Sequence, residues 1–364
     1  MKKVLIITNH SYMLYRFRLD LIRELMKKYE VVLSMPFVGH ESDFQAMGLR
    51  CIETKLDRRG IDPVSDLALF RRYWSMIREE KPDMVITYSI KPNVYAGVAC
   101  QMLHVPYCAN VQGLGTAFQG GALTKLVTVM YKTAFRGGKT VFFENRSNAD
   151  VFRDQAIVQR EKQVILPGAG INLSNFALTE YPGNDQIHFL YLGRIMKEKG
   201  VDELIAAFTR LHQELGDRVV LDIVGFYEDD FREKIESLIK EGIAVFHGFQ
   251  PEPRPYYAAA DCVVLPSYHE GMSNVLLEAA AMGRPVITCD IPGCREAVDD
   301  GISGYLCRVK DADSLYEQMR RMAEMSRQAR REMGIAGNEK MQRQFEKNKV
   351  VDMTIRAIFE EQKG

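Results

Sequence analysis

Short apolar runs alternate with segments of helical periodicity along most of the chain. The runs are rich in Val, Ile and Tyr, and they predict buried strands at 3–8, 29–35, 84–89, 107–112 and 140–144. Between them, apolar residues recur every three or four positions at 16–29 and 66–81, which predicts amphipathic helices. Because strands and helices alternate, and because the strands are apolar on both faces, the pattern predicts a parallel sheet covered by helices on both sides.

The alternation is interrupted at 164–186, where Pro, Gly and Asn cluster without helical periodicity. It then restarts, with strands predicted at 187–193, 219–225, 243–248, 262–267 and 284–289. We therefore expect two doubly wound α/β domains, at 1–165 and 187–348, joined by a linker at 166–186 and followed by a last helix near 349–362. Open parallel sheets bind ligands beyond the carboxyl ends of their strands, so two facing sheets would share a site in a central cleft.

The segment 267–286 (SYHEGMSNVLLEAAAMGRPV) places two glutamates eight positions apart. Glu278 lies in a predicted helix that is apolar nearly all round, so its carboxylate is expected to be buried. A buried carboxylate needs hydrogen-bond donors, which the two vicinal hydroxyls of a ribose would supply. The alternative is a glutamate at a partly exposed helix edge.

Glu270 lies in the loop before this helix. The loop is expected to offer free backbone amides at a helix start, which suit an anion or sugar hydroxyls. These amides belong to Gly271, Met272, Ser273 and Asn274.

A cluster of cations follows the strand predicted at 187–193. Arg194, Lys197 and Lys199 lie between a glycine and a helix, in GRIMKEKG (193–200). Such cations suit a diphosphate, and they would stabilise the charge that develops when a sugar–diphosphate bond breaks, without a metal ion. Solvated loop charge is the alternative for this segment taken alone.

Other strand-to-loop junctions are candidates for ligand contacts. Gly225 would let the backbone approach a ligand closely, and Phe249 would line a pocket for a base, although tight turns explain both segments equally well. In the first half, His10, Gln112 and Gly113 follow strands and are expected to face the cleft. For His10, an ordinary polar position in a turn is the favoured alternative.

Charge is unevenly distributed, although the formal net charge of the 364 residues is zero. Residues 1–170 carry 24 Lys and Arg against 16 Asp and Glu, and the remainder has the opposite excess. The segment 120–140 interleaves basic and apolar residues, which suits a helix lying on an anionic membrane surface. An amphipathic core helix with a basic exposed face is the slightly favoured alternative.

Several classes of protein are excluded by missing patterns. No run of 18 apolar residues exists, so no membrane-spanning segment is predicted. The seven cysteines form no C-x-x-C pair, which indicates reduced thiols in a cytoplasmic protein rather than disulfides or a zinc site. The chain has no Walker loop, no H-E-x-x-H, no G-x-S-x-G and no nucleic-acid motif, and its G-L-G lacks the dinucleotide spacing. We expect no metal and no cofactor.

Three motifs together resemble the retaining glycosyltransferases of family 4, which have the GT-B fold. They are the E-x7-E pair Glu270 and Glu278, GRIMKEKG (193–200) and GRPVITCDIPGCREAV (283–298). The resemblance covers nearly the whole chain and is strongest from 187 to 310. The first half, with TYSIKPNVYAGVAC (87–100) and NVQGLGTAF (110–118), looks like bacterial enzymes that build capsule, exopolysaccharide or lipid-linked glycans.

The resemblance implies roles for individual residues. Arg194 and Lys199 would hold the donor diphosphate, Glu278 would bind the ribose and Glu270 would lie near the donor sugar. The amides of residues 271–274 would cradle the sugar and the phosphate.

The resemblance also implies that the segment 349–364 packs back onto the first domain. Two departures bear on the acceptor side. The loop NHSYMLYRF (9–17) lacks the paired glycine of many relatives, and Gln112 stands where many have a histidine.

From these observations and the resemblance we expect a retaining, metal-independent transfer of a hexose or N-acetylhexosamine. The donor would be a nucleotide sugar, expected to be UDP-linked, and the acceptor a growing surface glycan on a polyprenyl diphosphate. Peripheral contact with the inner membrane face would follow from the basic first half. The alternatives are a nucleotide-sugar epimerase of GT-B architecture and a non-catalytic nucleotide-sugar-binding subunit.

Overall fold

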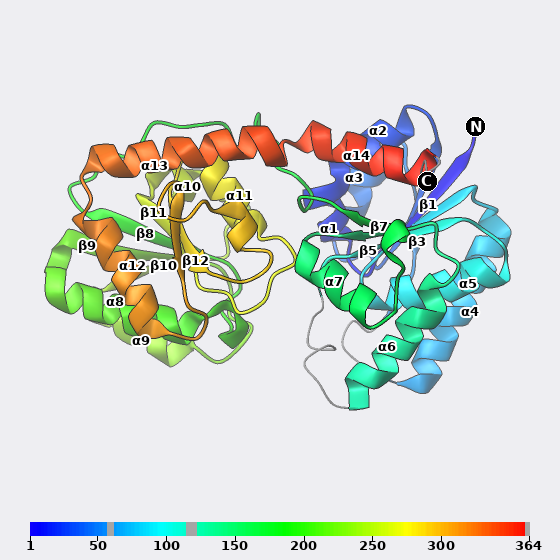
Figure 1. The fold of residues 1–364 in the computed structure, drawn as a ribbon, viewed down its shortest axis with the longest axis horizontal. Coiled ribbons are helices and arrows are strands. Elements are labelled where there is room, and N and C mark those ends of the chain that lie inside the picture. Colours follow the sequence, from blue (N-terminus) through cyan, green and yellow to red (C-terminus); the bar gives the residue numbers. More distant parts are fainter. Residues whose placement is uncertain (57–61, 114–121, 361–364) are drawn as a thin grey trace. The chain divides into compact units, whose positions relative to one another are not determined.

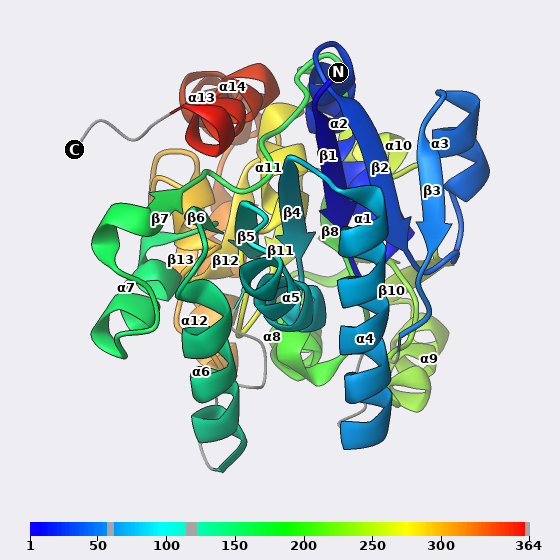
Figure 2. The same ribbon diagram turned by 90° about the vertical axis from the view of Figure 1, so that its right-hand side faces the viewer.

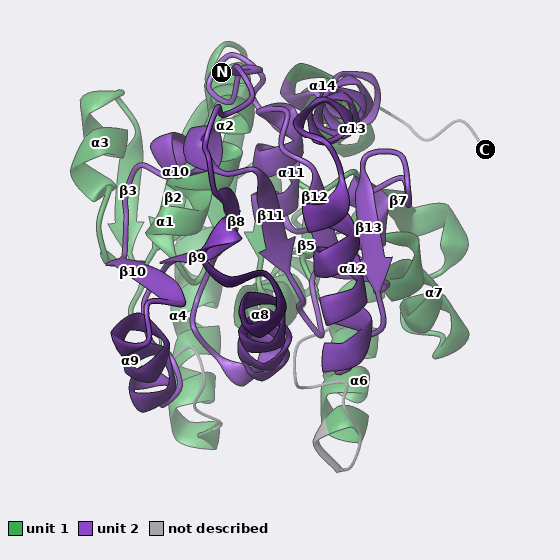
Figure 3. Cartoon of the chain, turned by 90° about the vertical axis from the view of Figure 1, so that its left-hand side faces the viewer, with its two compact units in different colours: residues 1–169, 348–364 green, residues 170–347 purple. Residues whose placement is uncertain are grey.

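The computed structural model describes residues 1–56, 62–113 and 122–360. The chain divides into two compact units, which are Met1–Ala169 with Asn348–Gly364 and Gly170–Lys347 (Figures 1 and 3). Each unit contains one parallel β-sheet, so the prediction of two doubly wound α/β domains is confirmed. Most of the motif NVQGLGTAF lies outside the described residues.

The sheet of the first unit has seven parallel strands in the order β3-β2-β1-β4-β5-β6-β7. The strands are β1 (Lys3–Ile7), β2 (Glu30–Met35), β3 (Arg50–Glu53), β4 (Met84–Tyr88), β5 (Tyr107–Val111), β6 (Thr140–Phe143) and β7 (Gln163–Ile165). The order reverses between β1 and β4, which is where doubly wound sheets bind ligands. At this point Ser89 Oγ donates a hydrogen bond of 2.7 Å to Asn9 Oδ1, which joins the loops after β4 and β1.

Alternating side chains of the first sheet pack against helices on its two faces. Val4 and Ile6 of β1 belong to one buried cluster, whereas Leu5 and Ile7 belong to another with Tyr73. The helices are α1 (Ser11–Met13), α2 (Leu19–Met26), α3 (Glu41–Ala46), α4 (Pro63–Glu80), α5 (Gly97–Met102), α6 (Ala122–Phe135), α7 (Arg146–Asp154) and α14 (Lys347–Phe359), with π-helical segments η1 (Leu14–Arg18) and η2 (Pro92–Ala96) and a 3-10 turn η4 (Arg160–Lys162).

The C-terminal helix α14 completes the core of the first unit. Val350, Val351 and Ile358 are buried in the same cluster as Val4 and Ile6. Lys139 Nζ donates to the carbonyl of Ile358 at 2.9 Å. The first sheet is therefore covered on one face by residues from the opposite end of the chain.

The sheet of the second unit has six parallel strands in the order β10-β9-β8-β11-β12-β13. The strands are β8 (Ile187–Leu192), β9 (Val219–Val224), β10 (Ala244–Gly248), β11 (Cys262–Leu265), β12 (Val286–Cys289) and β13 (Gly304–Cys307). The order reverses between β8 and β11. The loops after these two strands are therefore the place to look for a ligand site.

The helices of the second unit enclose a single large core on both faces of its sheet. They are α8 (Val201–Leu215), α9 (Arg232–Lys240), α10 (Arg254–Ala259), α11 (Asn274–Ala281), α12 (Ala312–Glu324) and α13 (Arg327–Lys340), with shorter turns η5 (Lys197–Lys199), η6 (Gly216–Arg218), η7 (Arg295–Ala297) and η8 (Met341–Phe345). No helix within the described ranges has the length and apolar character needed to cross a bilayer.

A linker was expected at 166–186, and within it residues 170–186 belong to the second unit. Ile171 and Phe176 are buried in its core. The hydroxyl of Tyr181 donates to the carbonyl of Asp261 at 2.7 Å, and the buried Arg284 donates to the carbonyl of Glu180 at 2.7 Å. The segment is irregular in secondary structure but anchored by these contacts.

Candidate active site

A lysine–glutamate pair lies where the strand order of the second sheet reverses. Lys199 follows β8, Glu270 follows β11, and the Nζ of the lysine forms an ion pair with Oε1 of the glutamate. Ser267 Oγ donates to the same oxygen at 2.8 Å. Both charged side chains are largely buried, with 16% and 14% of their surfaces exposed, so solvent screens the pair only weakly. The structure thus brings together two of the three predicted catalytic residues.

A glycine makes this close approach possible. Gly200 has φ of 69°, and a Cβ atom built on it would lie 2.1 Å from the carbonyl oxygen of Pro266. The amide of Tyr268 also donates to the carbonyl of Glu198 at 2.9 Å. The two loops are therefore joined through their backbones, which positions Lys199 beside Glu270.

Arg194, the third predicted catalytic residue, lies in the same loop after β8. Its guanidinium is 3.3 Å from Glu228 Oε2, and 44% of the side chain is exposed. The hydroxyl of Tyr191 donates to the backbone carbonyl of Arg194 at 2.6 Å. Glu228 was not singled out in the sequence, because a glutamate in a loop after β9 gives no signal of its partner. Each of the two predicted phosphate-binding cations therefore has a carboxylate beside it.

Glu278 lies on α11 and is only 6% exposed, which rules out the partly exposed helix edge. Tyr257 of α10, itself completely buried, donates its hydroxyl to Glu278 Oε2 at 3.0 Å. Arg284 Nε in turn donates to the backbone carbonyl of Tyr257 at 2.8 Å, which fixes the end of α10. A protein hydroxyl thus supplies a donor that we had expected from a ribose. The tyrosine was missed because it lies in a different helix.

The loop before α11 packs against the loop after β12 that contains Gly293. Gly293 has φ of 86°, and a Cβ atom on it would lie 2.5 Å from the carbonyl oxygen of Gly271. The carbonyl of Gly293 accepts a hydrogen bond of 2.9 Å from the amide of Ser273. The prediction that all amides of 271–274 are free is therefore wrong for Ser273. Met272 and Ser273 are buried, whereas Gly271 and Asn274 are partly exposed.

Gly225 and Phe249 follow β9 and β10. A Cβ atom on Gly225 would lie 1.8 Å from the carbonyl oxygen of Gly193, so this glycine is required where two loops meet. The ring of Phe249 is 56% exposed and lies at 6.0 Å from that of Phe226, which is 45% exposed. Two exposed aromatic rings thus lie edge to face, with an angle of 69° between their planes, beside the carboxyl ends of these strands. The sequence analysis singled out only one of them.

The predicted acceptor-side residues lie in the first unit. His10 follows β1, its amide donates to Thr8 Oγ1 at 3.4 Å, and its ring meets Tyr12 edge-on at 6.2 Å. Gln112 and Gly113 follow β5 directly and are partly buried. All three are thus at the carboxyl edge of the first sheet.

A buried ion pair at this edge was not predicted. Arg18 of η1 donates to Glu144 Oε1 at 2.8 Å, and its guanidinium lies 5.3 Å from the ring centre of Tyr88. Arg18 is only 6% exposed. Because Tyr88 ends β4 and Glu144 follows β6, Arg18 contacts the ends of both strands.

A second polar cluster lies across β8, β9 and β10. The Asp222 carboxylate accepts hydrogen bonds from His188 Nδ1 at 2.8 Å and from His247 Nε2 at 2.7 Å. The hydrogen bond with Asp222 raises the pKa of His188. Burial opposes ionisation of Asp222, but the hydrogen bonds from both histidines lower its pKa. The cluster therefore links three neighbouring strands through hydrogen bonds between ionisable side chains.

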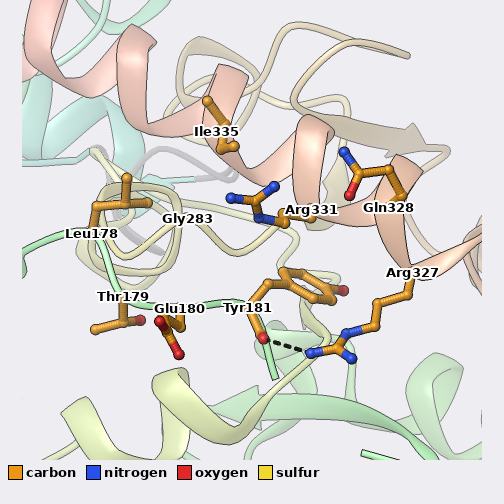
Figure 4. Close-up of a pocket in the computed structure, with 9 residues that line it drawn as sticks. All are labelled: Leu178, Thr179, Glu180, Tyr181, Gly283, Arg327, Gln328, Arg331 and Ile335. Carbon is orange, nitrogen blue, oxygen red and sulfur yellow. Dashed lines mark hydrogen bonds between the residues drawn. The ribbon is translucent and has the colours of Figure 1, made fainter. Parts of the chain in front are cut away.

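A cavity of about 690 Å³ lies beyond the other end of α11 (Figure 4). The side chain of Arg331 points into it, and Arg327 donates to the carbonyl of Tyr181 at 3.2 Å. It is lined by Leu178, Thr179, Glu180, Tyr181, Gly283, Arg327, Gln328, Arg331 and Ile335. None of these residues belongs to the predicted site, so this cavity is separate from it.

Comparison with known proteins finds glycosyltransferase families for both halves of the chain. Residues 3–145 match the family model described as glycosyl transferase 4-like, and residues 186–325 match glycosyl transferases group 1. The N,N'-diacetylbacillosaminyl-diphospho-undecaprenol alpha-1,3-N-acetylgalactosaminyltransferase of Campylobacter jejuni is 25% identical over 325 residues, covering 84% of this chain and 85% of that protein. The capsular polysaccharide biosynthesis glycosyltransferase CapM of Staphylococcus aureus is 24% identical and covers 79% of each chain.

The fold is also that of solved glycosyltransferases. Anabaena HepE, solved in complex with UDP and glucose, superposes with a TM-score of 0.80 at 15% identity, over 98% of this chain and 99% of that one. The two parallel sheets correspond to the GT-B architecture. The chain therefore belongs to the GT-B glycosyltransferases, with a glycosyl transferase 4-like first half and a glycosyl transferases group 1 second half.

Proposed function

We propose that the protein transfers a hexose or N-acetylhexosamine from a UDP-linked donor, with retention of the anomeric configuration, to a glycan carried on a polyprenyl diphosphate. The observation that carries the proposal is the group Arg194, Lys199 and Glu270 after β8 and β11. The two cations suit the donor diphosphate, and their neighbouring carboxylates hold them in place until the anion arrives.

The donor nucleotide would bind along the carboxyl ends of β8 to β11. Glu278, held by Tyr257, would accept hydrogen bonds from the ribose, and the exposed rings of Phe226 and Phe249 would stack on the base. The Anabaena protein was solved with UDP and glucose, which makes UDP the first nucleotide to test.

The chemical step would use charge rather than a bound metal. The bond between the sugar C1 and the β-phosphate oxygen breaks, and a bond from C1 to the acceptor oxygen forms on the same face. The acceptor proton passes to the departing phosphate, and Arg194 and Lys199 stabilise the negative charge that develops there. Stronger binding of the more charged state lowers the barrier.

The acceptor would be met by the first unit, through His10 and the Gln112-Gly113 segment. The Campylobacter jejuni relative is named for an acceptor on diphospho-undecaprenol, which supports a polyprenyl diphosphate carrier here. Such an acceptor resides in a membrane, so the protein would work at the cytoplasmic face through peripheral contact of its basic first half. Failure to co-sediment with anionic vesicles at low salt would contradict this contact.

The test is release of nucleoside diphosphate from a panel of UDP- and GDP-sugars, with and without membrane lipid extract. We expect release with one UDP-sugar, dependent on lipid. Lys199→Met should abolish most of it, whereas Lys240→Met, an exposed lysine on α9, should not change it. NMR of the new glycosidic bond would show whether the configuration is retained.

Other outcomes identify the alternatives. Sugar isomerisation without an acceptor would indicate an epimerase. Saturable UDP binding without turnover under any acceptor would indicate a binding subunit. Absence of nucleotide binding would refute the assignment of this site.

A further inference from the structure

The first unit contains a mostly apolar pocket of about 430 Å³. Its walls come from α4, η2 and α6, and α5 lies between α4 and α6 (Figure 2). The principal lining residues are Leu67, Phe70, Val94, Tyr95, Leu126 and Met130. The volume lies within the range of about 300–1,000 Å³ that is usual for ligand pockets.

The pocket lies at the edge of the sheet where the acceptor-side residues are found. A helix that follows a parallel strand begins at the carboxyl edge of the sheet, and the lining residues come from the first half or middle of each helix. The segment η2 follows β4 closely, and Gln112 follows the neighbouring strand β5. The pocket and the acceptor-side residues are therefore on the same edge of one rigid sheet.

The apolar lining is open to solvent at two points. Leu67 is 49% exposed and Leu126 is 52% exposed, although both line the pocket. The charged groups of the pocket are paired with each other, since Lys91 Nζ lies 2.8 Å from Asp66 Oδ1. Burial, with a hydrogen bond to Asp66, raises the pKa of Tyr95, so its hydroxyl stays neutral. The pocket thus offers hydrocarbon contacts and no net charge.

The exposed face of α6 next to the pocket-lining one carries positive charge. Lys125 precedes Leu126 on α6, and Lys132 follows two turns later. Both are exposed, and neither has an ion-pair partner among the residues that the structure describes. An occupant with a hydrocarbon chain and an anionic head would be complementary to this surface.

We propose that this pocket holds the first isoprene units of the acceptor's polyprenyl chain, with the diphosphate next to Lys125. The inference rests on the proposed function, and it assigns the lipid part of the substrate to α4, η2 and α6. A pocket with walls from three helical segments accepts one chain in a fixed position. Bilayer lipids, in contrast, contact an amphipathic surface without a defined register. Holding the chain here fixes the distance from the diphosphate to the sugar that reacts.

The probe is farnesyl diphosphate, a short polyprenyl diphosphate, titrated into the full chain by calorimetry. The substitutions Leu67→Ser and Leu126→Ser should each weaken its binding about tenfold, as expected for the loss of about two buried methylenes. Val64→Ser and Val129→Ser are matched controls, because these residues lie on the same two helices, are 78% and 60% exposed, and do not line the pocket. Both controls should bind like the wild type.

Inorganic diphosphate and phospholipid vesicles distinguish the other occupants. Equal binding of inorganic diphosphate would show that only the anion is recognised and would overturn the assignment. Two results together would also overturn it: farnesyl diphosphate does not bind, and Leu126→Ser binds phosphatidylglycerol vesicles more weakly than the wild type does. Those results would indicate a bilayer contact. Equal effects of pocket and control substitutions would overturn it as well.

The transfer assay separates this inference from the proposed function. If lipid-dependent transfer occurs, Leu67→Ser and Leu126→Ser should raise the KM for the lipid acceptor about tenfold and leave the KM for the donor unchanged. Transfer with unchanged acceptor KM would refute the pocket assignment alone. Farnesyl diphosphate binding with the expected variant pattern, but without transfer from any donor, would refute the proposed function alone.

Discussion

Replacing Tyr257 by Phe tests whether a protein hydroxyl sustains the buried carboxylate of Glu278. The hydroxyl donates to Glu278 Oε2 at 3.0 Å, and both residues are nearly or completely buried. The substitution removes one oxygen and leaves the ring and its packing in place. The carboxylate stays in the interior with one donor fewer.

The expected cost follows from this geometry. A hydrogen bond to a charged group contributes about 1.5–3 kcal/mol net, and a buried acceptor that loses its donor bears the cost of lost solvation. We therefore expect Tyr257→Phe to lower the free energy of unfolding by about 2 kcal/mol. For a unit the size of Gly170–Lys347, each kcal/mol corresponds to about 2–4 °C, so Tm should fall by about 4–8 °C.

Differential scanning calorimetry, with and without UDP, measures the change in Tm and the stabilisation by the nucleotide. Because Glu278 is the proposed ribose ligand, UDP should stabilise Tyr257→Phe less than it stabilises the wild type. Tyr73→Phe provides a control, since Tyr73 is buried and its hydroxyl has no hydrogen-bond partner within the described residues. That substitution should be neutral or slightly stabilising.

A double-mutant cycle with Glu278→Gln gives the refuting result. If the two residues interact as described, their effects on unfolding should deviate from additivity by more than about 0.5 kcal/mol. Additive effects, or a Tm of Tyr257→Phe equal to that of the wild type, would show that the hydroxyl does not support the carboxylate.

Three further predictions follow from other contacts. Arg194→Ala should lower turnover more than tenfold with little change in Tm, because the side chain is 44% exposed and its proposed action is on the transition state; a change in KM alone would contradict this. His188→Gln should lower the free energy of unfolding most below about pH 6.5. The pKa of His188 is raised in the folded protein, so the protonated ring pairs fully with Asp222 at that pH, and the pairing weakens as pH rises through the pKa of the folded state. A Tm difference from the wild type that does not shrink between about pH 6 and pH 9 would refute this. Gly200→Ala should destabilise by more than about 1 kcal/mol and reduce transfer, whereas Gly216→Ala, at φ of 59° with open space around it, should cost less and leave transfer intact. Equal effects of the two would argue against the tight loop contact.

The interior strands could be predicted because they are apolar on both faces. The strands β3, β7 and β13 were not singled out, since each is an edge strand of only three or four residues, and β3 and β7 are only partly buried. An edge strand such as Arg50–Glu53 carries charges at its ends and has no alternation to detect. In the segment 164–186, Pro and Gly dominated the pattern. The buried Phe176 and Tyr181 show that aromatic residues there indicate packing, not a free linker.

The candidate site was predicted in part because its charged residues lie in loops directly after strands. Arg194, Lys199 and Glu270 could be assigned to one site because each follows the carboxyl end of a predicted strand, and because the family resemblance joins them in one donor site. Their partners could not be predicted, since Glu228 and Tyr257 come from other segments and meet the site only through the tertiary fold. The sequence also does not show that the Ser273 amide is occupied, because its acceptor is a backbone carbonyl far along the chain.

The return of α14 to the first unit has a consequence for biosynthesis. Domains of most proteins fold in the order in which the ribosome makes them. Here Val350, Val351 and Ile358 complete the core around β1, so the half of the protein that is translated first lacks part of its interior until the last helix has been synthesised. The second unit, Gly170–Lys347, contains all of its own core and can fold as soon as it emerges. The unit whose strands are translated earlier is thus the unit that finishes folding later, and a nascent chain stalled before residue 348 would expose an apolar sheet face to chaperones.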